Sequence, residues 1–125
     1  MQLLDILRVL NGRIVNHINT PELELYSGGA ADLMSDVLAF TTDGNSLLFT
    51  GLTNQQVVRT AEMANIGAIV FVRGKQPSSA TIELADELHI PLIACDYSMY
   101  QACGLAYQAG LPNNRLADLR PEPSP

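Results

Sequence analysis

Apolar residues recur along the chain with two spacings, one typical of helices and one of short strands. Leu3, Ile6, Leu7 and Leu10 share one helical face near the start. The same spacing predicts further helices over 30–38, 53–64, 81–88 and 99–109. Between them, apolar or alternating runs predict strands over 13–16, 22–26, 46–50, 68–72 and 91–95.

The strands over 46–50 (SLLFT), 68–72 (AIVFV) and 91–95 (PLIAC) are mainly apolar and alternate with amphipathic helices. This pattern indicates a mostly parallel sheet with helices on both faces, because both sides of each strand must be buried. We therefore expect a single three-layer α/β domain over residues 1–111. Residues 112–125 read as a Pro-rich C-terminal tail, which we expect to be partly disordered.

The composition and net charge of the chain exclude some classes of binding partner. The 125 residues carry a net charge of −6 and give a pI of about 4.6, and the seven Lys and Arg residues are scattered. Such a surface repels nucleic acid and anionic membranes, so neither is expected as a partner. The N-terminal residues do not read as a signal peptide, and the two cysteines form no CxxC motif. We expect a cytoplasmic protein.

Ligands of open parallel sheets bind at the carboxyl ends of the strands. Four predicted strand-to-helix loops should meet there, namely 27–29, 51–54, 73–78 and 96–98. The candidate ligand-binding residues come from these loops and their flanks. They are Gly28, Gly29, Asp32, Ser35, Thr50, Thr53, Asn54, Arg73, Gly74, Lys75, Asp96 and Ser98.

The first of these loops contains Gly28-Gly29 directly before a predicted helix. Its backbone N–H groups could face an anion, or the glycines could serve only a tight turn or a close approach of two backbones. Asp32 and Asp36 are predicted one helical turn apart, with Ser35 between them. They could hold a divalent cation or form a solvated polar face.

The third loop contains the cations Arg73 and Lys75 around Gly74. They favour an anionic or phosphate-bearing ligand, although two solvated charges on a turn explain them equally simply. Thr53 is predicted to cap the helix that follows it, as Ser98 is for the last helix.

Thr50 and Asn54 would add polar groups to the same edge, and Asp96 is free to face the crevice. Neither His17 nor His89 is expected at this edge, and Cys95 and Cys103 read as buried thiols. No nucleophile–base pair or metal site can be assembled, and no cofactor is expected.

Three stretches together resemble the DRTGG domain family: YSGGAADLMSDVLAF, SLLFTGLTNQQVV and the run from GAIVFVRGK to GLAYQAGL. The order of these segments and the GG-x-x-D-L-x-S-D-V core carry the resemblance. The chain is also similar to the non-catalytic N-terminal domain of HPr kinase. The family's name motif reads differently here, as Gly51-Leu52-Thr53-Asn54 and Arg73-Gly74-Lys75. The resemblance implies an α/β regulatory, dimer-forming accessory to enzymes such as CBS-containing pyrophosphatases.

The leading hypothesis is therefore a non-catalytic, homodimeric regulatory module that binds a small anionic or nucleotide-like ligand or docks on a partner enzyme. One alternative is a metal-assisted phosphoryl-transfer or hydrolytic enzyme that uses Asp32, Asp36 and Asp96. Another is a purely structural dimerisation domain.

Overall fold

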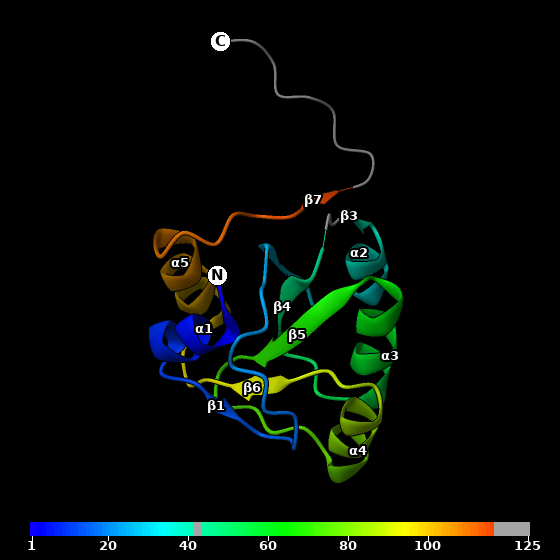
Figure 1. The fold of residues 1–125 in the computed structure, drawn as a ribbon. Helices are drawn as coiled ribbons and strands as arrows, with labels where there is room; N and C mark the ends of the chain where they lie inside the picture. Colours follow the sequence, from blue (N-terminus) through cyan, green and yellow to red (C-terminus); the bar gives the residue numbers. More distant parts are fainter. Residues whose placement is uncertain (42–43, 117–125) are drawn as a thin grey trace.

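The computed structural model describes residues 1–41 and 44–116 (Figure 1). The helices are α1 (Leu3–Leu10), α2 (Met34–Leu38), α3 (Gln55–Met63), α4 (Ser79–Glu87) and α5 (Met99–Gln108). The strands are β1 (Arg13–Ile14), β2 (Ser27–Ala30), β3 (Phe40–Thr41), β4 (Ser46–Thr50), β5 (Ile66–Phe71), β6 (Leu92–Ala94) and β7 (Arg115–Leu116).

A five-stranded sheet with the order β1-β6-β5-β4-β2 forms the middle of the molecule. The strands β2, β4, β5 and β6 run parallel, and only β1 is antiparallel to its neighbour β6. A separate two-stranded sheet pairs β3 with β7. The predicted α/β architecture with a mostly parallel sheet is confirmed.

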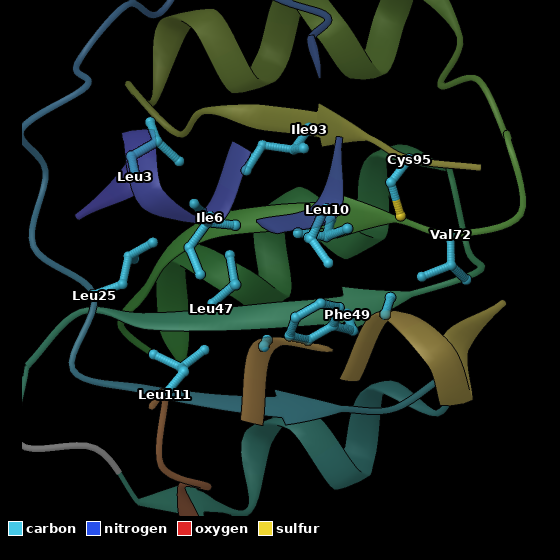
Figure 2. Close-up of a cluster of buried hydrophobic side chains, with 14 residues drawn as sticks. Leu3, Ile6, Leu10, Leu25, Leu47, Phe49, Val72, Ile93, Cys95 and Leu111 are labelled. Atoms are coloured by element: carbon cyan, nitrogen blue, oxygen red, sulfur yellow. The ribbon is translucent and has the colours of Figure 1, made fainter. Parts of the chain in front are cut away.

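Helices cover both faces of the sheet (Figure 1). On one face, α1 and α5 pack over a cluster that includes Leu47, Phe49 and Ile93, drawn in Figure 2. On the other face, α2, α3 and α4 pack over a second cluster that includes Leu48 and Ile69. Leu47 and Leu48 are adjacent in β4 yet belong to opposite clusters, because successive side chains of a strand point to opposite faces.

Side-chain caps fix where three of the helices begin. Asn54, Ser78 and Ser98 each accept a hydrogen bond from a backbone N–H three residues further on. The cap predicted at Ser98 is therefore confirmed. The cap predicted at Thr53 is wrong: α3 begins one residue later, and the Thr53 carbonyl instead accepts a hydrogen bond of 2.9 Å from the Thr81 hydroxyl.

The strand predicted over 22–26 does not join the sheet. This segment runs beside the N-terminus, where Leu3 N donates to Leu23 O at 2.8 Å and Leu25 N donates to Met1 O at 2.8 Å. Its only ladder contact in the described part of the chain is an isolated bridge from Glu24 to Gln2. The apolar Leu25 is buried in the α1 cluster, which explains the alternating pattern without a strand.

The prediction of a turn at Gly28-Gly29 is also wrong, because both glycines lie in the strand β2. A Cβ at Gly28 would lie 2.8 Å from Cδ2 of Leu111, so a side chain there would push against the Leu111 side chain. Gly28 N donates to Pro112 O and Asn114 N donates to Gly28 O, each at 2.8 Å. The glycines thus allow a close approach of two backbones.

The following helix is shorter than predicted. Leu33 has extended backbone angles and precedes α2, so Asp32 lies outside the helix and does not share a helical face with Asp36. No helix of the described residues is long and apolar enough to cross a membrane.

Candidate functional site

Asp32 ties the end of β2 to the end of β4. Its Oδ1 accepts hydrogen bonds from Thr50 Oγ1 at 3.0 Å and from Gly51 N at 2.7 Å. The Thr50 hydroxyl in turn accepts from Leu52 N at 3.2 Å, and Thr50 is fully buried. The first two loops are thereby fastened together at the carboxyl edge of the sheet.

Arg73 reaches the same point from the neighbouring loop. A Cβ at Gly51 would lie 3.0 Å from Arg73 Nη2 and 3.6 Å from Asp32 Oδ1, so both charged groups face this glycine. The backbone at Arg73 is held by two hydrogen bonds of 2.8 Å, from Arg73 N to Tyr97 O and from Gly74 N to Cys95 O. The guanidinium is therefore presented by a loop that is fixed to the end of β6.

Arg73 has a backbone conformation that its residue type disfavours. Its φ is 60°, in the left-handed region, and Gly74 follows with a φ of 65°. The other non-glycine residues with positive φ among those described are Asn11, Asn65 and His89, and each lies at the end of a helix. Such a conformation is ordinary at a helix end. At Arg73 and Gly74 it belongs to a two-residue turn, which Lys75 N closes by donating to Val72 O at 3.2 Å.

Asp96 supplies a carboxylate on the far side of this loop. Its Oδ1 lies 3.2 Å from the position that a Cβ at Gly74 would occupy. It also lies 3.9 Å from Arg13 Nη1, and both of these side chains are largely exposed. The edge therefore presents two carboxylates and the Arg73 guanidinium around the two glycines Gly51 and Gly74.

The remaining predicted residues fall into three groups. Asn54 and Ser98 are helix caps, and Thr53 contributes its backbone carbonyl to α4. Ser35, Asp36 and Lys75 are exposed. Gly28 and Gly29 instead line a pocket over the sheet, together with Phe49 and Leu111.

Cys95 holds the edge cluster through its backbone carbonyl, which accepts from Gly74 N, but its thiol is buried. Burial raises the pKa of the Cys95 thiol, and the neighbouring Asp96 charge raises it further. Burial also raises the pKa of Cys103. Both thiols therefore stay protonated near neutral pH, which is the unreactive form. His17 is exposed and pairs with Asp86 at 2.9 Å.

Within 1–41 and 44–116, no three His, Cys, Asp or Glu side chains lie close enough to hold a metal ion. The alternative that used Asp32, Asp36 and Asp96 together requires such a group. Asp32 is also already engaged with Thr50 and Gly51.

Comparison with known proteins identifies a family and similar solved structures. One of these structures is that of the CBS and DRTGG domains of the regulatory region of Clostridium perfringens pyrophosphatase, complexed with its activator diadenosine tetraphosphate. The two folds agree with a TM-score of 0.68 at 19% sequence identity.

The match covers 95% of this chain and 52% of the other, so this chain spans about half the length of its structural neighbour. At this identity the likeness shows the fold. No curated protein matches the sequence. The family model of the DRTGG domain matches residues 5–109, and the chain therefore belongs to the DRTGG domain family.

Proposed function

We propose that the chain is a non-catalytic regulatory module that senses a small anionic, nucleotide-like ligand at the carboxyl edge of its sheet. The observation that carries the proposal is the position of the Arg73 guanidinium, whose Nη2 would lie 3.0 Å from a Cβ at Gly51. A guanidinium is the preferred partner of phosphate groups. The hydrogen-bonded turn over residues 72–75 fixes the backbone from which this side chain extends.

Two further observations support a regulatory role. DRTGG domains stand beside CBS domains in the regulatory region of the Clostridium pyrophosphatase, and that region binds a dinucleotide activator. The exposed Lys75 lies two residues after Arg73 and gives the loop a second cation. Diadenosine tetraphosphate, AMP and inorganic phosphate are therefore the first probes.

The test is a thermal-shift and amide NMR titration of the whole chain with these three probes. A ligand at a hundredfold excess over its Kd stabilises the folded state by about 2.7 kcal/mol, which raises Tm by several degrees. We expect the Gly51 and Gly74 amides to shift during the titration. The proposal fails if none of the three anions raises Tm.

Arg73→Gly separates binding from folding. Glycine adopts positive φ without strain, so this variant should be as stable as the wild type or more stable, while it loses the ligand response. Arg59→Ala is the matched control, because Arg59 is exposed on α3 and carries the same charge. If Arg73→Gly keeps the full response, the edge cluster is not the site.

Docking on a partner enzyme and homodimer formation are the second candidate function. They are favoured by the exposed apolar side chains Leu33, Leu38 and Met63, which are 61%, 51% and 69% accessible. Sedimentation equilibrium of the wild type and of Leu38→Ser tests this candidate, which requires a dimer that the serine weakens. We place the module in the cytoplasm as part of the same proposal.

A further inference from the structure

A pocket of about 420 Å³ lies between β2 and α5, separate from the edge cluster. Gly28, Gly29 and Phe49 line it from the sheet, and residues of α5 line it from the other side. Figure 2 shows Phe49 and Leu111 on this side of β4. The volume falls in the range of small-molecule sites, which is about 300–1,000 Å³. None of Asp32, Arg73 and Asp96 lines it.

Gly104 keeps the pocket open from the α5 side. It lies inside the helix, where glycine costs about 1 kcal/mol relative to alanine. Its φ is not positive, and a Cβ at this position would meet no atom within 4 Å. Neither backbone conformation nor packing therefore requires a glycine here. The missing side chain leaves room in the pocket. A glycine that destabilises its helix without a local reason is consistent with a pocket that must stay open.

Two exposed tyrosines flank this glycine. Tyr100 and Tyr107 line the pocket from α5 and are 91% and 68% accessible. They are seven positions apart in sequence, which places them on one face of the helix with about 10.5 Å between them along its axis. Exposed aromatic rings at the rim of an apolar pocket offer stacking surfaces.

The chemistry of the lining restricts the occupant. No lining residue carries a charge. Apart from Cys103 and Asn113, the walls are aromatic, aliphatic or glycine. Because an ionised group would lose its hydration without gaining a partner, the part of a ligand that enters must be neutral. The acidic chain as a whole also repels an anion from a site that lacks a cation.

We propose that this pocket binds a flat, uncharged aromatic ring, which enters between Tyr100 and Tyr107 and rests on the Gly28-Gly29 backbone and the Phe49 ring. The site is independent of the anion site proposed above, and either can fail without the other.

Naphthol and its saturated counterpart decahydronaphthol are the probes, because they have similar size and polarity but only the first is flat. In amide NMR spectra of the whole chain, naphthol should shift the signals of Gly28, Gly29 and Gly104. It should also quench the tyrosine fluorescence, which no tryptophan obscures. Decahydronaphthol should bind about tenfold more weakly. Equal binding of the two probes, or shifts scattered over the chain, would overturn the proposal.

Gly104→Leu fills the pocket without disturbing the fold, since its side chain enters open space and leucine favours a helix. We expect naphthol affinity to fall at least about tenfold while Tm stays the same or rises. Gln101→Leu is the control, because it adds the same side chain to an exposed position of α5 outside the lining. Unchanged affinity in Gly104→Leu would remove the site.

Tyr100→Ala and Tyr107→Ala test the stacking surfaces, with the exposed Tyr26→Ala as their control. Each of the first two should weaken naphthol binding, and the control should not. Sedimentation equilibrium of the wild type and Gly104→Leu completes the test. If the wild type is a dimer that Gly104→Leu dissociates, a second copy occupies the pocket and the proposal is wrong.

Discussion

At the scale of single residues, Asp32 has a structural task as well as a place in the candidate site. It satisfies the hydroxyl of the buried Thr50 and the N–H of Gly51 at once. In Asp32→Ala, both donors lose this acceptor, and because Asp32 is exposed, water can take over part of its role. We expect this variant to lose about 0.5–1.5 kcal/mol of unfolding free energy, measured from the midpoint of urea denaturation.

Asp36→Ala provides the control for this loss. Asp36 has the same charge, lies four residues away and is exposed, so its removal should change stability by less than about 0.5 kcal/mol. Equal midpoints for the two variants would show that the bonds to Asp32 contribute nothing. Ligand titrations at the edge cluster should therefore use Arg73 variants, because Asp32 variants combine lost binding with lost stability.

At the scale of elements, two glycines on either side of the pocket should respond to alanine in opposite directions. Gly28→Ala places a methyl group 2.8 Å from Cδ2 of the buried Leu111, so this side chain must give up its present packing. The expected loss is about 1–3 kcal/mol. Gly104→Ala meets no atom and should gain up to about 1 kcal/mol. Thermal and urea unfolding would measure the two changes in unfolding free energy. A Gly28→Ala variant as stable as the wild type would contradict the close packing at Gly28.

The attachment of α4 to the segment after β1 should depend on pH. Burial works against ionisation of Asp86, but the backbone N–H and ring of His17, with Asn16, outweigh it, so the pKa of Asp86 lies below its ordinary value of 3.8. A lowered pKa adds stability above the unfolded pKa, and this contribution disappears as pH falls through the folded value.

Asp86→Asn isolates this contribution, because the amide oxygen can still accept from His17 N while the charge is absent. We expect the variant to be less stable at neutral pH by less than about 1 kcal/mol, since His17 is largely exposed. The difference should close as pH falls below about 4. Urea midpoints of both proteins would be measured across this pH range. A stability difference that stays constant with pH would contradict a lowered pKa of Asp86.

At the scale of the whole molecule, the sequence predicted those parts that depend on burial and connection order. The strands over 46–50, 68–72 and 91–95 were recognisable because both of their faces are apolar. Their parallel order then places Thr50, Arg73 and Asp96 at one edge, as the contacts around Gly51 and Gly74 confirm.

The parts that the sequence did not predict depend on partners distant along the chain. The strand β2 has the sequence SGGA, which contains no strand-forming side chain, and it is held by β4 and residues 112–114. Because the pocket forms where α5 crosses this strand, it was missed as well. The glycine inside α5 was the one local signal of a pocket.

The same long-range pairing raises the question of where the folded unit ends. The predicted domain stops at residue 111, and the family match stops at 109. Yet Pro112 and Asn114 hydrogen-bond to Gly28 on the free edge of β2, and β7 pairs with β3. The contacts of Gly28 join residues more than 80 positions apart. Residues 112–114 therefore cover the edge of the sheet at β2.

Two shortened chains test this boundary. A chain ending at residue 111 loses both backbone hydrogen bonds of Gly28 to the C-terminal segment, and each contributes about 0.5–1.5 kcal/mol. A chain ending at residue 116 keeps them together with the pairing of β7. We expect the shorter chain to be less stable by about 1–3 kcal/mol, and the Gly28 amide to exchange with solvent faster in it. If the two chains share one urea midpoint and one exchange rate at Gly28, the folded unit ends at residue 111, because residues 112–116 then add nothing to the edge they cover.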